Sequence, residues 1–251
     1  IAGYEPKQAA WSLSIWHGIL LISVAGWGLY LNGERLGLIS SLLVAITPAL
    51  LQLRSDYVLE MPVAATVSLS LWRIGSWQDS KLGGRWTQVF IAAIAVALAI
   101  LTKQSSLLIL LPIFAWVSIS SIRRSMSKKL QLLSGLVIIG LTIFPWLRHN
   151  WITTLGGTNR AIFESASREG DPSLWTLENW TWYVKLIPQQ VGLLILVIGI
   201  SGCILWRLKK LPYNKIYSKK NNYLDNIDGW KWLLTSLFLG FLFTTISPNK
   251  D

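Results

Sequence analysis

Two carboxylates and an arginine lie close together in a chain that is otherwise strongly apolar. The stretch reads Arg54-Ser55-Asp56-Tyr57-Val58-Leu59-Glu60-Met61-Pro62, and long apolar segments lie on both sides of it. Charged side chains at membrane depth are costly and are therefore candidates for function. Carboxylates such as Asp56 and Glu60 can activate or orient a hydroxyl group that acts as a nucleophile. We interpret the stretch as the mouth of a membrane-embedded site.

The spacing of the two carboxylates leaves two local structures open. Asp56 and Glu60 are four residues apart, so they share a face if one helix already begins near Asp56. Pro62 is tolerated only in the first turn of a helix, so the helix can instead begin close to Glu60. Asp56 is then a loop or cap residue. Its carboxylate is as well suited to capping a helix as to a place in the site.

Lys103 is a second isolated charge. It follows the apolar run Trp86–Leu101 and precedes another apolar run. Its ammonium group could bind a phosphate at the level of the lipid head groups, or it could simply reach water along the membrane surface. Arg148 and His149, which follow a later apolar segment, are either interface anchors or further site residues.

The elements that must position these residues are membrane helices. The chain has 251 residues, of which 52% are hydrophobic and 14% charged, whereas a soluble domain has about a quarter charged residues. Several apolar runs approach the roughly 20 residues that cross a bilayer. We predict an all-α, polytopic transmembrane helix bundle with about eight spans. They cover about residues 11–31, 36–53, a third segment that follows the stretch 54–62 and ends at about 77, and then about 86–101, 106–122, 130–147, 187–208 and 231–246.

The connections between these spans differ in length and charge. Residues 148–186 are polar and rich in Trp, which predicts a larger external loop with short interfacial helices. Asn179-Trp180-Thr181 within it is a formal glycosylation sequon. Residues 207–231 are rich in Lys and Asn, which predicts a basic cytoplasmic loop. We assign residues 1–251 to a single transmembrane domain.

The distribution of charge predicts the orientation of the chain. The net charge of +11 would suggest nucleic acid in a soluble protein. If the spans alternate, however, 15 of the 23 Lys and Arg residues lie on one side with only 4 of the 12 acids. The positive-inside rule makes that side cytoplasmic. The stretch 54–62, Lys103, Arg148 and residues 250–251 then lie on the opposite, non-cytoplasmic face.

Several kinds of chemistry have no signature in the chain. No His/Cys/Asp cluster has the spacing of metal ligands, and neither a phosphate-cradling glycine motif nor Gly-x-Ser-x-Gly occurs. The single cysteine, Cys203, rules out an internal disulfide. We therefore expect no metal, no cofactor and no nucleic-acid partner.

Four motifs, in this order, resemble those of a glycosyltransferase family. Arg54–Pro62 is similar to an Arg-x-x-Tyr-x-x-acid-x-Pro element that opens a membrane helix. Ala99–Ser105 is similar to a Leu-Thr-Lys junction between two helices. Phe144–Trp151 is similar to a Pro-Trp-x-x-Arg-Asn exit into a large external loop. Ser247–Asp251 is similar to Ser-Pro-x-Lys-Asp. The chain thus resembles the multi-spanning GT-C glycosyltransferases, and most closely family 39, which includes protein mannosyltransferases and aminoarabinose transferases.

The resemblance implies transfer of a sugar from a polyprenyl-phosphate donor, on the non-cytoplasmic face, to a lipid, glycan or protein acceptor. It implies catalytic roles for Glu60 and Asp56 and binding of the donor phosphate by Lys103, Arg54 and Arg148. The family's main catalytic carboxylate has no counterpart here, so we expect the chain to be a fragment in which that residue lies upstream of Ile1. The further candidate site residues are Tyr57, Gln104, His149, Lys250 and Asp251.

Two other classes of function compete with the glycosyltransferase. A membrane transporter or lipid flippase would also be polytopic, but such proteins often show internal repeats and helices broken near mid-membrane. A non-catalytic scaffold would use the charges for topology alone. The absence of a visible repeat and the gathering of charges on one face favour the enzyme. The absence of secretory disulfides and the Lys/Asn-rich loop indicate a bacterial inner membrane, with the site facing outward.

Overall fold

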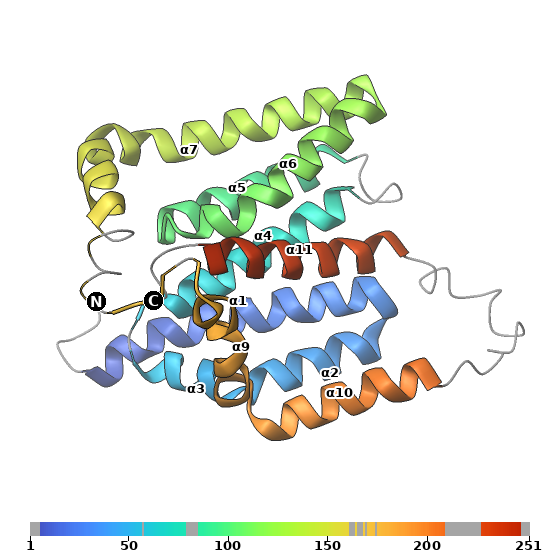
Figure 1. Ribbon diagram of the computed structural model, residues 1–251. Helices are drawn as coiled ribbons and strands as arrows, with labels where there is room; N and C mark the ends of the chain where they lie inside the picture. The colour runs from blue at the N-terminus through green and yellow to red at the C-terminus, as the bar shows by residue number, and fades with distance from the viewer. Residues whose placement is uncertain are drawn as a thin grey trace, which may run out of the picture. The chain divides into compact units, whose positions relative to one another are not determined.

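The computed structural model describes residues 6–56, 58–78, 85–160, 164, 168, 170–173, 175–208 and 227–246. All regular structure in these residues is helical, which confirms the predicted fold class (Figure 1). The chain divides into two compact units, which we describe one at a time. The first unit comprises residues 1–65 and 185–230, and the second comprises residues 66–184 and 231–251.

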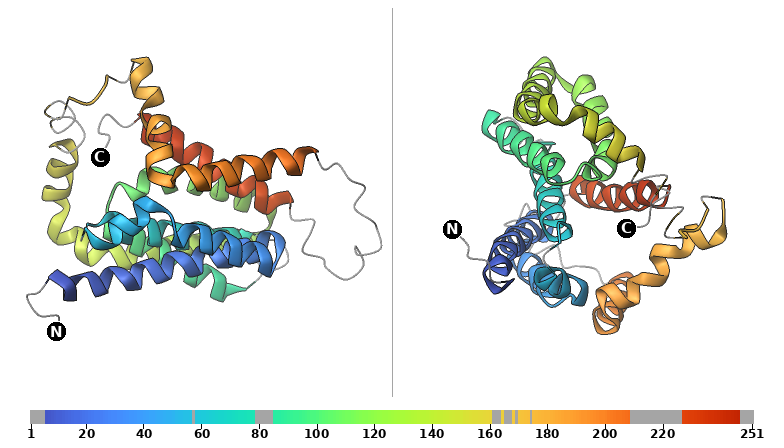
Figure 2. Two further views of the ribbon diagram at one scale, coloured as in Figure 1. Left: turned by 90° about the horizontal axis from the view of Figure 1, so that it is seen from below. Right: turned by 90° about the vertical axis from the view of Figure 1, so that its left-hand side faces the viewer.

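The first unit is built around an antiparallel pair of helices, α1 (Pro6–Asn32) and α2 (Glu34–Ala45). They lie side by side in Figures 1 and 2, joined by Gly33 with φ 84°. This positive φ suits glycine, and the turn falls between the spans predicted at residues 11–31 and 36–53. The other helices that contribute to this unit are α3 (Pro48–Ser55), the start of α4 (Glu60–Gln78), the end of α9 (Leu177–Val191), α10 (Leu193–Leu208) and the start of α11 (Ile227–Ile246).

Two glycines bring α1 and α2 into close contact. A Cβ atom placed on Gly28 would lie 2.7 Å from the Cα of Gly37. A Cβ atom placed on Gly37 would lie 2.7 Å from the backbone oxygen of Ala25. Small residues allow such close packing between membrane helices, where lipid supplies no hydrophobic driving force for association.

We expect Gly37→Ala to lower the free energy of unfolding by about 1–3 kcal/mol, because the added methyl group must displace backbone atoms of α1. Thermal denaturation of the protein in detergent measures the change. Gly140→Ala is the matched control, since a Cβ atom at Gly140 meets nothing within 4 Å. Alanine there should be neutral or stabilising by up to about 1 kcal/mol. Equal stability of the two variants would contradict the close packing of α1 on α2.

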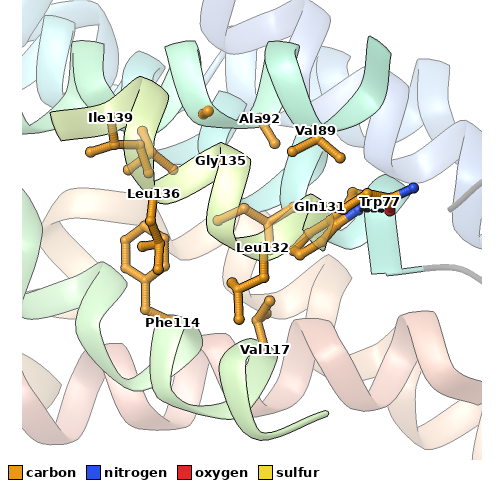
Figure 3. A pocket seen from close by; sticks show the side chains of 13 residues that line it. Trp77, Val89, Ala92, Phe114, Val117, Gln131, Leu132, Gly135, Leu136 and Ile139 are labelled. Carbon is orange, nitrogen blue, oxygen red and sulfur yellow. Dashed lines mark hydrogen bonds between the residues drawn. The ribbon is translucent and has the colours of Figure 1, made fainter. Parts of the chain in front are cut away.

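The second unit contains α5 (Trp86–Thr102), α6 (Ser106–Arg124) and α7 (Met126–Asn159), which lie side by side in Figures 1 and 2. Together with α4 they border an open apolar groove (Figure 3). The Trp77 Nε1 atom donates a 2.9 Å hydrogen bond to the Gln131 Oε1 atom at one end of this groove. Both side chains are buried, so the bond satisfies polar groups that lipid could not.

The predicted number of eight spans is not confirmed. In the described residues, four helices are long and apolar enough to cross a membrane, or up to six if each of two bent pairs is one span. Helix α5 is apolar but has only 17 residues, and α4 is not among the helices that are both long and apolar enough. The four helices contain residues 11–32, 106–124, 126–157 and 229–246.

The helix that contains the sixth predicted span continues beyond Leu147, where the span was predicted to end. Helix α7 continues to Asn159, through the start of the predicted external loop. The polar residues after Leu147 include no proline, and the Asn150 side chain donates a hydrogen bond of 2.9 Å to the Trp146 carbonyl within the helix. Polarity alone therefore did not mark a helix end.

The spans predicted at residues 36–53 and 187–208 are both broken. Helices α2 and α3 meet at a bend of 58°, and α9 and α10 meet at a bend of 104°. Pro48 is the first residue of α3, where its missing N–H is tolerated. Gly192 lies at the second break with φ 89°, and a Cβ atom there would lie 3.1 Å from the Pro48 Cγ atom. The two breaks thus pack against each other within the first unit.

The sequon at Asn179 lies inside the second unit. Asn179 is 0% exposed, and its Nδ2 atom, which a glycan would have to modify, donates a 3.0 Å hydrogen bond to the carbonyl of Thr245. The folded structure therefore offers no access to this nitrogen.

Candidate functional site

Arg54 and Asp56 lie at the end of the short helix α3. Thr47 precedes this helix in an extended conformation, and its hydroxyl group donates a hydrogen bond of 2.9 Å to the Leu43 carbonyl of α2. The backbone N–H of Asp56 donates to the carbonyl of Gln52 at 3.1 Å and closes the helix. The side chains of Arg54 and Asp56 are both exposed.

Glu60 is the first residue of α4, so it does not share a helix with Asp56. Of the two arrangements that the spacing left open, the structure has the one in which the helix begins at Glu60. Asp56 is the C-cap residue of the preceding helix α3, through its backbone N–H, and no side-chain cap at the start of α4 is observed for it. Pro62 accordingly falls in the first turn of α4, where a proline fits. Glu60 is half-buried, and the next residue, Met61, is fully buried in a cluster with Leu13 and Leu20 of α1. The carboxylate therefore lies at the edge of the apolar core of the first unit.

Lys103 lies in the predicted short connection between α5 and α6. Its backbone N–H donates to the carbonyl of Ala99 at 3.2 Å, and its own carbonyl accepts a 2.7 Å hydrogen bond from the Ser106 hydroxyl. The same hydroxyl also lies 2.7 Å from the Ala99 carbonyl. These bonds fix the backbone of the turn and place a half-buried lysine next to the exposed Gln104.

Arg148 and His149 are exposed on α7 rather than in a loop. They lie in the helical extension that the sequence did not predict, more than a full turn before its end. Tyr57, Lys250 and Asp251 lie outside the residues that the structure describes.

The candidate residues thus fall into two groups. Arg54, Asp56 and Glu60 belong to the first unit, whereas Lys103 and the Arg148–His149 pair belong to the second. The first group is held together by the α3–α4 connection. The roles of both groups, and their meeting in one site, stay predictions.

His17 is a buried polar residue that was not among the predicted site residues. His17 lies inside α1 and is only 5% exposed, and its Nδ1 atom is buried without a hydrogen-bond partner among the described residues. A histidine within an apolar run of more than 20 residues was the available signal. Among the described residues, no group of three or more His, Cys, Asp or Glu side chains could hold a metal ion.

Comparison with known protein families gives one match. Residues 8–149, more than half of the chain, match the family described as dolichyl-phosphate-mannose-protein mannosyltransferase. The match includes the stretch 54–62, the Lys103 turn and the Arg148–His149 pair. No curated protein and no solved structure matches the chain.

Proposed function

The chain belongs to the dolichyl-phosphate-mannose-protein mannosyltransferase family, and we propose that it moves a sugar from a polyprenyl-phosphate donor to an acceptor on the non-cytoplasmic face of a membrane. The family and the long apolar helices together make it an integral membrane glycosyltransferase. The observation that carries the proposal is that the matched residues include the isolated charges of both candidate groups. A polyprenyl donor also accounts for a site built at the membrane surface.

The proposed reaction is a substitution at the anomeric carbon of the sugar. The acceptor hydroxyl oxygen forms the new bond while the bond from that carbon to the phosphate oxygen breaks. A carboxylate receives or orients the hydroxyl proton, and polyprenyl phosphate leaves with the electron pair. We assign Glu60, assisted by Asp56, to the hydroxyl, next to a principal carboxylate expected upstream of Ile1. We assign Lys103, Arg54 and Arg148 to the departing phosphate, because fixed cations stabilise the charge that develops there.

The acceptor is a lipid, glycan or protein that reaches the same face. The orientation rests on the excess of Lys and Arg in the connections assigned to the cytoplasm. In that orientation α4 begins and α5 ends on the outer side, so Glu60 and Lys103 share that side. A bacterial inner membrane, with the site facing outward, is the setting that we propose.

One observation favours a second candidate, a transporter or lipid flippase. The breaks at Ile46–Thr47 and at Gly192 pack against each other, and paired discontinuous helices are frequent at the sites of transporters. A flippase would move the polyprenyl-phosphate sugar across the bilayer without breaking its bond to phosphate. The two functions therefore differ in whether free polyprenyl phosphate is formed.

We expect the full-length protein in proteoliposomes to release polyprenyl phosphate from polyprenyl-phosphate mannose when a membrane extract supplies acceptors. A labelled mannose should appear in a product that no longer carries the polyprenyl chain. GDP-mannose should give no product in liposomes without polyprenyl phosphate, because the proposed donor is the polyprenyl-phosphate sugar and not a nucleotide sugar. Intact donor moved between leaflets would favour the flippase, and product formed directly from GDP-mannose would overturn the proposal.

A further inference from the structure

His17 is an uncompensated polar group inside the first unit. It lies in a span that is long and apolar enough to cross the membrane, residues 11–32. Its Nδ1 atom has no hydrogen-bond partner among the described residues. Burying a polar group without a partner is unfavourable. Several buried polar atoms of the described residues lack a partner, and the His17 atom is distinguished from the others by its neighbours at the start of α4.

The direction of the His17 side chain follows from its neighbours on α1. Leu13 and Leu20 lie one turn before and one turn after it, on the same face of the helix. Both leucines belong to the buried cluster that contains Met61 and Ala65 of α4. His17 therefore faces the start of α4, where Glu60 immediately precedes Met61.

The same neighbours give the depth of this region. His17 is six residues after Trp11, where the candidate span begins, which corresponds to about 9 Å along the helix axis. Because Met61 packs in the cluster with Leu13 and Leu20, α4 begins at this depth and not at the level of Pro6. Glu60 and His17 thus lie at a similar depth.

Arg54 places a positive charge near the same histidine. Arg54 directly follows Leu53, which packs against the cluster that contains Leu13 and Leu20, and it makes no ion pair with any residue that the structure describes. Arg54 is exposed while His17 is buried. A ligand that enters from the exposed side would therefore meet the cation before it meets the imidazole.

We propose that His17 binds a hydroxyl group of the sugar that the polyprenyl-phosphate donor carries, while Arg54 faces its phosphate; this inference rests on the proposed function. A hydroxyl both donates and accepts hydrogen bonds, so it can pair with the Nδ1 atom in either tautomer. A donor whose charged phosphate stays near Arg54 would place its neutral sugar deeper, toward Glu60 and His17. His17 is then a residue that recognises the sugar and takes no part in the proton transfer.

The test compares two lipids on the full-length protein in detergent, polyprenyl-phosphate mannose and polyprenyl phosphate without a sugar. We expect His17→Phe to weaken binding of the mannose lipid about tenfold, the value of one hydrogen bond to a buried group. Binding of the sugar-free lipid should change less than about twofold. His17→Asn, which keeps a polar atom near the Nδ1 position, should recover part of the loss.

Trp27→Phe is the matched control. Trp27 is also buried on α1, and its Nε1 atom likewise lacks a partner among the described residues. The Trp27→Phe protein should bind both lipids as tightly as the wild type does. If His17→Phe does not accumulate as folded protein, His17→Ala makes the same comparison without added bulk.

Each other outcome overturns a different claim. Equal weakening for both lipids, or for neither, would overturn the role of His17 in sugar recognition and leave the proposed function standing. A wild-type protein that binds neither lipid would overturn the proposed function itself.

Discussion

Replacement of Glu60 by Gln is expected to reduce sugar transfer by at least about a hundredfold, the usual range for loss of a positioned acid or base. Glutamine keeps the size of the side chain but cannot carry the negative charge that orients or deprotonates the acceptor hydroxyl. The half-buried position of Glu60 at the start of α4 makes water a poor substitute for the lost group. The rate of release of polyprenyl phosphate at saturating donor measures the effect.

Glu178→Gln is the control for this experiment. Glu178 is an exposed acid in the first turn of α9, in the stretch predicted to be external. The Glu178→Gln substitution should leave the rate of sugar transfer unchanged. Asp56→Asn should cost less than Glu60→Gln, because Asp56 is exposed and ends α3. A Glu60→Gln protein that inserts into the membrane and transfers sugar at the normal rate would remove Glu60 from the mechanism.

Lys103→Met is expected to reduce kcat/KM for the polyprenyl-phosphate sugar by about a hundredfold. Removal of one fixed donor that stabilises developing charge typically costs about that much. Methionine keeps much of the apolar stem, so contacts with lipid are preserved while the ammonium group is lost. Lys103→Arg should retain part of the activity, since it keeps the charge but changes the geometry.

The alternative for Lys103 is that its ammonium group only reaches water. Lys185→Met, which removes an exposed lysine from α9, shows the effect of losing one surface charge. If Lys103→Met behaves like Lys185→Met in both transfer and membrane insertion, Lys103 has no role at the phosphate. A loss confined to Lys103→Met, with normal insertion, is the result that we expect.

The sequence was sufficient to predict the helical fold and several of its turns. Long apolar runs identify membrane helices directly, and the short polar interruptions at Gly33 and Lys103 fall where the structure places them. The start of α4 could also be predicted from the sequence, because Pro62 restricts where a helix can begin. The family resemblance carried by the motifs around Glu60 and Lys103 is confirmed by the family match.

Other features depend on contacts that the local sequence does not contain. The polar residues after Leu147 indicated a loop, although nothing in them stops a helix before Gly156. Gly192 lies inside an apolar run, and its break is recognised only from the bend and from its contact with Pro48. His17 was missed because one histidine in an apolar run is ambiguous until its neighbours are known. Charge counting along the chain could not show that two of the predicted spans are bent.

The side of the membrane on which the sugar arrives tests the central claim most directly. The transfer reaction is run in sealed vesicles of known orientation that contain the full-length protein and labelled polyprenyl-phosphate mannose. A mannosidase that cannot cross the bilayer is then added. In right-side-out vesicles we predict that the enzyme removes the label from the product, whereas in inside-out vesicles the label is protected. Removal only in inside-out vesicles would contradict a site on the non-cytoplasmic face that contains Glu60 and Lys103.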